Sequence, residues 1–127
     1  MLKTDLTLRN PLRCLSGPSD DILAPGQLGG VLARAGVGKT ALMVQIALNA
    51  MLNARNVLHI SLNQPVHKAG LWYQDIFNHI ASDLGVPQSS QVWESLLPHR
   101  FIMTFRTDSF SIPRLEERLG DLIEQNI

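Results

Sequence analysis

A short glycine-rich run followed by a lysine and a threonine is the part of this sequence best suited to chemistry. The run Gly36-Val37-Gly38-Lys39-Thr40 stands between two apolar segments. Glycine lets the backbone wrap closely around an anion, and a wrapped backbone turns successive N–H groups towards that anion. The pattern predicts a phosphate-binding loop between a strand and a helix, in preference to a simple turn that starts a helix.

Each residue type in this loop has a role in binding a triphosphate. Backbone N–H groups would form the anion site, and the positive end of the following helix would strengthen it. The Lys39 ammonium would contact the outer phosphates, and the Thr40 hydroxyl would serve as a ligand of Mg²⁺. The predicted nucleotide-binding residues are Gly36, Val37, Gly38, Lys39, Thr40 and Ala41.

Apolar periodicity predicts the elements that must position this loop. They are a strand at residues 27–33, a helix at 39–52, a strand at 57–62, a helix at 70–84, a short helix at 92–97, a strand at 101–105 and a helix capped by Ser111. Strands that alternate with helices predict parallel strands joined by right-handed crossovers, with helices on both sheet faces. The expected fold class is therefore α/β, with a three-layer parallel sheet.

Composition limits the classes of protein to which the chain can belong. Its 127 residues carry no formal net charge and are 45% hydrophobic. This excludes a wholly disordered chain and a globally basic nucleic-acid binder. Turn-forming pairs such as Asn10-Pro11 and Gly17-Pro18 mark residues 1–25 as an N-terminal segment, which leaves residues 26–127 as the nucleotide-binding domain.

The lone cysteine and the absence of long apolar runs indicate a cytoplasmic setting. Cys14 cannot form an internal disulfide or a cysteine-based zinc cluster. The start of the chain lacks the apolar run of a signal peptide, and residues 41–52 are too few to cross a bilayer. We therefore expect no membrane partner.

The residues around the loop resemble a known family. The run from Ala33 to Leu42 resembles the A-R-P-x-x-G-K-T-A loop of DnaB-type replicative helicases, with Ala35 at the position of the proline. Residues 25–28, Pro-Gly-Gln-Leu, are similar to the P-G-x-L that leads into the first strand of DnaB and KaiC proteins. The resemblance covers residues 25–64 and then continues only in element order. It implies a RecA-like P-loop ATPase fold with ATP as ligand.

Two departures from the family pattern concern hydrolysis. Asn63 stands where the family has a glutamate after Ser-Leu, and an amide cannot accept the proton of the attacking water. Such a base contributes roughly 10²–10⁴ in rate. Either the usual base is lost, or a downstream acid replaces it, or the register is shifted by one residue.

The second departure is the missing Walker B acid. After the loop, no apolar run ends directly in an aspartate, since residues 101–105 are followed by Arg106-Thr107-Asp108. In the RecA-like order the Mg²⁺-anchoring strand would follow residue 127. We therefore expect an incomplete sheet with an exposed apolar strand edge.

Three functions follow from these patterns. The first is an ATP-binding protein of the RecA/DnaB/KaiC type with Mg²⁺ as cofactor and weak or no hydrolysis. The second is a DnaB-like, DNA-translocating helicase ATPase that assembles as a homo-oligomer, although the dispersed arginines form no basic stripe. The third is a non-catalytic interaction module gated by nucleotide. The four histidines have no metal-binding spacing, and core packing is the favoured role of Trp72, Tyr73 and Phe77.

Overall fold

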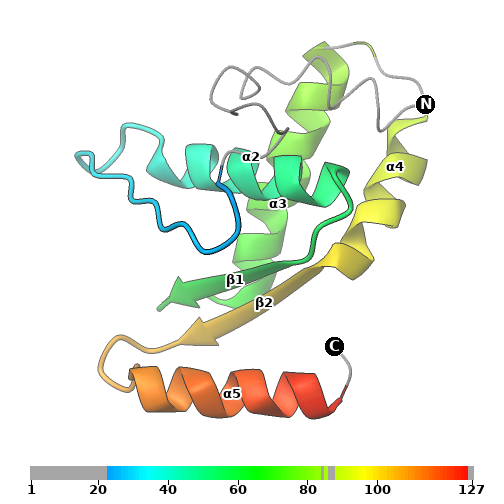
Figure 1. Ribbon diagram of the computed structural model, residues 1–127. Helices are drawn as coiled ribbons and strands as arrows, with labels where there is room; N and C mark the ends of the chain where they lie inside the picture. The colour runs from blue at the N-terminus through cyan, green and yellow to red at the C-terminus, as the bar shows by residue number, and fades with distance from the viewer. Residues whose placement is uncertain (1–22, 84, 86–87, 126–127) are drawn as a thin grey trace.

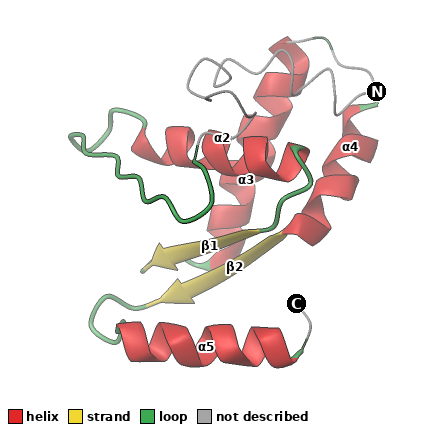
Figure 2. Cartoon of the chain, in the orientation of Figure 1, coloured by secondary structure: helices red, strands yellow, loops and turns green. Residues whose placement is uncertain are grey.

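The computed structural model describes residues 23–83, 85 and 88–125. Its elements alternate along the chain, as Figures 1 and 2 show: α2 (Lys39–Leu52), β1 (Val57–Leu62), α3 (Val66–Asp83), α4 (Ser89–Leu96), the 3₁₀ turn η2 (Leu97–His99), β2 (Arg100–Phe105) and α5 (Ile112–Glu124). The predicted α/β class is confirmed in its coarse form, because the described chain is a small domain with helices around a parallel sheet. The predicted N-terminal segment lies mostly outside the described residues, as does Cys14.

The two strands pair in parallel along their whole length. Val57 is opposite Arg100 at one end of the ladder and Leu62 is opposite Phe105 at the other. Parallel pairing requires a crossover connection, and α3 and α4 supply it. The strands predicted at residues 57–62 and 101–105 are thereby confirmed, the second with one additional residue.

The predicted strand at residues 27–33 is wrong for the described structure. This stretch forms no regular element, and its apolar side chains are not buried: Leu28 is 98% exposed and Leu32 is 100% exposed. A strand needs a neighbour for its N–H and C=O groups, and the described sheet contains only β1 and β2. Gly29 and Gly30 further lower the tendency to form a strand without such a neighbour.

The predicted helices form, with shifts at their ends. α2 matches its prediction, whereas α3 begins at Val66 instead of residue 70, because Pro65 accepts the first helical hydrogen bonds, from Lys68 and Ala69. The predicted end of this helix at residue 84 lies outside the described residues. The Ser111 side chain accepts a bond from the Arg114 N–H at 3.3 Å, which confirms the predicted cap of α5.

The core lies between α2, α3 and α4. α2 buries Val44, Leu48, Met51 and Leu52, whose spacing of three and four places them on one helical stripe. They meet Tyr73 and Phe77 of α3 and Val92 and Leu96 of α4. Core packing is thus confirmed for Tyr73 and Phe77, while Trp72 is only half-buried.

Helix α5 packs much more loosely than the other helices. It lies on the opposite side of the two strands from α2 and α3 (Figure 1). None of its residues is buried, although the helix is strongly amphipathic. A groove of about 840 Å³ separates it from β2. Among the described helices, none has both the length and the apolar character that a membrane span requires.

Candidate functional site

The glycine-rich turn has the backbone conformation that the sequence predicts for it. Gly36 has φ of 82° and Gly38 has φ of 95°, and Gly38 is the N-cap of α2. Residues with side chains rarely adopt these dihedrals. A Cβ on either glycine would meet no atom within 4 Å, so the backbone dihedral, and not the available space, explains the glycines.

The start of α2 presents backbone donors that the helix does not use. The Leu42 N–H donates to the Gly38 carbonyl at 3.0 Å, which leaves the N–H groups of residues 39–41 without an intrahelical acceptor. No side chain caps this end, and the first turn contains no acidic residue. An anion would satisfy these donors and would face the positive end of the helix dipole.

Lys39 spans the loop. Its Nζ donates to the Ala33 carbonyl at 2.7 Å, so the side chain links the end of the turn to its beginning. This contact places the ammonium group beside the segment that precedes the residues predicted to bind phosphate. Thr40 is the next residue in the helix and is exposed, as a ligand of a phosphate-bound cation would be.

A cavity of about 590 Å³ lies between the start of α2 and the end of β1. It is lined by Val31, Lys39, Thr40, Met43, His59, Ile60, Ser61, Leu62, Gln64 and Trp72. Ligands of parallel α/β sheets bind beyond the carboxyl ends of the strands, and this cavity has that position. The structure therefore brings Lys39 and Thr40 together with side chains of β1 and α3.

Asn63 does not line this cavity, because its side chain is engaged elsewhere. Its Oδ1 accepts a hydrogen bond from the Thr107 N–H at 2.9 Å, and its Nδ2 donates to the Thr107 hydroxyl. Its own N–H donates to the Phe105 carbonyl at 2.8 Å, and its φ is 67°. Asn63 thus fastens the end of β1 to the segment that follows β2.

Asn63 should contribute to stability in two ways, through its side-chain hydrogen bonds and through its tolerance of a left-handed backbone. Asn63→Gly keeps the left-handed backbone and removes both side-chain hydrogen bonds, so we expect a loss of about 1–2 kcal/mol in the free energy of unfolding. Asn63→Ala should lose about 1 kcal/mol more, because a Cβ is unfavourable at this φ. Urea denaturation measures both variants. An alanine variant as stable as the glycine variant would refute the backbone part of this prediction.

His59, which lines the cavity, belongs to a polar cluster that the sequence did not indicate and whose other members do not line the cavity. His59 Nδ1 lies 2.7 Å from the Tyr73 hydroxyl, and the Arg100 guanidinium lies over the Tyr73 ring at 4.9 Å. Trp93 covers Arg100 at 5.8 Å, and Arg100 Nη1 is buried without a hydrogen-bond partner. Burial raises the pKa of Tyr73 to about 12, with Arg100 opposing the shift. These residues come from β1, α3, α4 and β2, so no local sequence pattern connects them.

His59 should make stability depend on pH. Burial, and then the charge of Arg100, lower the pKa of His59 below its ordinary value of 6.5. The unfolded chain therefore takes up this proton first as the pH falls. The contribution of neutral His59 is fully present above pH 6.5 and should be lost progressively as the pH falls from there through the lowered pKa.

Urea midpoints measured between pH 8 and pH 5 check this dependence. His59→Gln keeps a hydrogen-bonding group at the position and should flatten the decline below pH 6.5. His79→Gln changes an exposed histidine of α3 and should retain the decline of the wild type. A His59→Gln profile identical to that of the wild type would contradict the prediction.

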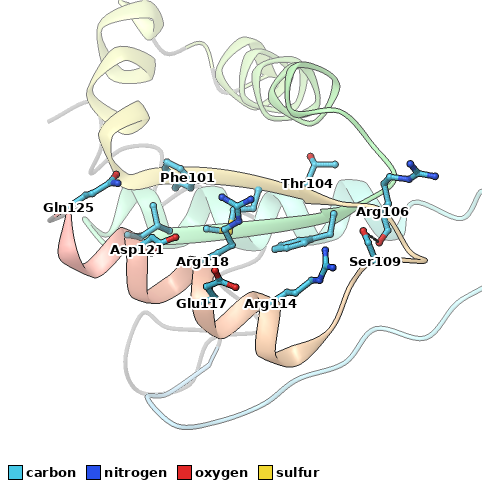
Figure 3. Close-up of a pocket in the computed structure, with 12 residues that line it drawn as sticks. Phe101, Thr104, Arg106, Ser109, Arg114, Glu117, Arg118, Asp121 and Gln125 are labelled. Carbon is cyan, nitrogen blue, oxygen red and sulfur yellow. Dashed lines mark hydrogen bonds between the residues drawn. The ribbon is translucent and has the colours of Figure 1, made fainter.

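Three of the arginines that are dispersed in the sequence, Arg106, Arg114 and Arg118, line the groove between β2 and α5. Figure 3 shows Arg114 and Arg118 extending from α5 towards the strands, with Arg106 at the end of β2. Glu117 and Asp121 line the same groove, and Arg106 pairs with the exposed Asp108 at 3.3 Å. The mixed charge differs from the continuous basic surface of a nucleic-acid groove.

Within the described ranges, no three His, Cys, Asp or Glu side chains are placed to hold a metal ion together. A Mg²⁺ ion bound through Thr40 would take its remaining ligands from phosphate oxygens and water, which is the usual arrangement for this ion. The exposed Thr40 hydroxyl beside the unused helix N–H groups fits that requirement.

Comparison with known proteins adds no relative. No family model matches the chain, and neither a curated protein nor a solved structure is significantly similar to it. The residues and the backbone geometry of the loop therefore carry the functional assignment by themselves.

Proposed function

We propose that this chain is an ATP-binding protein with a P-loop of the RecA/DnaB/KaiC type. The observation that carries the proposal is the left-handed turn at Gly36 and Gly38, which leads into an uncapped helix start with Lys39 across the loop. In this proposal the backbone donors of residues 36–41 bind the phosphates. Lys39 exchanges its bond to the Ala33 carbonyl for bonds to phosphate oxygens, which are charge-assisted at both ends.

The proposal includes the finer fold expected from the resemblance. The pair β1–β2 would be part of a three-layer, RecA-like parallel sheet, with α2 and α3 on one face and α5 on the other. The loose packing of α5 and the unpaired outer edge of β2 in the described sheet are compatible with further strands. The strand expected before the loop is absent from the described structure, so the proposal rests on the glycine-rich turn and the helix that follows it.

Hydrolysis in this chain would be slow or absent. The Asn63 amide is bonded to Thr107 and is not part of the cavity beside Lys39. An amide accepts no proton, so this residue cannot take the role of the family's glutamate. Mg²⁺, when bound, would offset the negative charge of the phosphates, and Thr40 would supply one of its ligands.

A direct binding measurement tests the proposal. The 127-residue chain is titrated into a fluorescent ATP analogue with Mg²⁺, and again after EDTA removes the cation. We expect saturable binding that weakens without Mg²⁺. At a free ATP concentration 100 times the dissociation constant, stability should also rise by about 2.7 kcal/mol. Absence of both effects would reject the proposed function.

Two further measurements distinguish the proposed ATP-binding protein from the helicase and from the nucleotide-gated interaction module. DNA-stimulated ATP hydrolysis by the chain would favour the helicase, whereas the mixed charge of the β2–α5 groove gives that reading no support. A change in subunit number on ATP addition, without hydrolysis, would favour the nucleotide-gated module. Sedimentation velocity with and without ATP distinguishes a fixed assembly from a gated one.

A further inference from the structure

Gln64 is a polar residue in the wall of the cavity beside the phosphate loop. It is half-buried, follows the end of β1 by two positions, and lines the same cavity as Lys39 and Thr40. The Thr104 hydroxyl of β2 donates to the Gln64 carbonyl at 2.7 Å. This bond fixes the backbone of Gln64 to the neighbouring strand, so its position relative to the cavity is well defined.

The side-chain amide of Gln64 is available for a ligand. In the part of the chain that the structure describes, this amide makes no hydrogen bond. Two neighbouring polar side chains are engaged elsewhere: Asn63 with Thr107, and His59 with Tyr73. The amide of Gln64 therefore has two donors and one acceptor that no group of the described chain uses, in a residue that lines the same cavity as Lys39 and Thr40.

We propose that Gln64 recognises the terminal phosphate of a bound nucleoside triphosphate. This inference rests on the proposed function, since it requires the phosphates to lie on the loop at residues 36–41. The terminal phosphate then faces the cavity at Lys39 and Thr40, which Gln64 also lines. The amide N–H₂ donates to an oxygen of that phosphate, and the amide oxygen holds a water molecule.

The consequence is selectivity for the triphosphate without proton transfer. A diphosphate has no group at this position, so it makes no bond to Gln64. An amide can orient a water molecule but cannot take its proton, which agrees with slow hydrolysis. Gln64 thus senses whether the nucleotide carries its last phosphate.

The test compares fluorescent ATP and ADP analogues on the 127-residue chain with Mg²⁺ present. Gln64→Ala should weaken ATP binding about three- to tenfold, the effect of one lost hydrogen bond, and should leave ADP binding within twofold of the wild type. Gln64→Glu should weaken ATP binding at least as much, because its carboxylate repels the phosphate. Gln74→Ala is the matched control, since Gln74 is exposed on α3 and should change neither affinity.

The outcomes separate this inference from the function on which it rests. If Gln64→Ala weakens ATP and ADP binding equally, or changes neither, while the wild type binds both, Gln64 does not read the terminal phosphate. If the wild type binds neither nucleotide, the proposed function fails and this inference fails with it. Thermal unfolding of both Gln64 variants should match that of the wild type, because the Gln64 side chain makes no hydrogen bond in the described chain.

Discussion

Lys39→Ala should weaken the binding of Mg²⁺·ATP by about tenfold to a hundredfold. The Lys39 ammonium is the one charged side chain in the predicted loop, and the Ala33 carbonyl holds it across the turn. In the bound state it would make charge-assisted bonds to phosphate oxygens, each worth on the order of 1.5–3 kcal/mol. Titration of a fluorescent ATP analogue into the variant and the wild type measures the difference.

Two further variants show whether the effect belongs to the site. Lys68→Ala removes an exposed lysine at the start of α3, so it changes the net charge equally and should keep wild-type affinity. Lys39→Arg keeps the charge but replaces a compact ammonium with a planar fork, and we expect an intermediate affinity. Equal affinities of Lys39→Ala and the wild type would show that the phosphates bind elsewhere.

Phe77→Ala should lower the stability of this domain by a large amount. Phe77 is 2% exposed and packs on Trp93 at 5.2 Å between ring centroids, where α3 meets α4. Truncation of a buried phenylalanine costs about 3–5 kcal/mol, because apolar contacts are lost and a cavity remains. Small domains are stable by about 5–15 kcal/mol in total, so the variant would be marginal at 25 °C.

The matched control lies on the same helix. Leu71 is 53% exposed, and Leu71→Ala should change the free energy of unfolding by about 0.5 kcal/mol or less. Urea unfolding followed by Trp fluorescence gives both values. A loss below about 1 kcal/mol for Phe77→Ala would mean that α4 does not pack on α3 in solution.

The glycine-rich turn before α2 illustrates what local sequence can predict. Glycine tolerates left-handed dihedrals that residues with side chains rarely adopt, and Gly36 and Gly38 adopt them here. Ser111 likewise caps α5 through a bond to a residue three positions away. In each case the determining interactions join residues close in the chain.

The strand expected at residues 27–33 shows the opposite case. Its apolar residues are typical of a buried strand, but a strand forms only against a neighbour that is distant in sequence. The described sheet supplies none, so Leu28 and Leu32 are left exposed. The sequence pattern indicates that the segment could form a strand, but whether it does depends on a neighbouring strand with which it can pair.

Local sequence determined the left-handed turn at Gly36 and Gly38, helix α2 and the Ser111 cap, because those depend on dihedral preferences and short-range hydrogen bonds. Tertiary structure alone decided that Asn63 binds Thr107, that His59 meets Tyr73 and Arg100, and that Gln64 shares a cavity with Lys39. These contacts join residues up to 44 positions apart. The Asn63–Thr107 bond forms only when β1 and β2 pair in register, and the contacts with Tyr73 and Lys39 form only when α3 and α2 pack on β1.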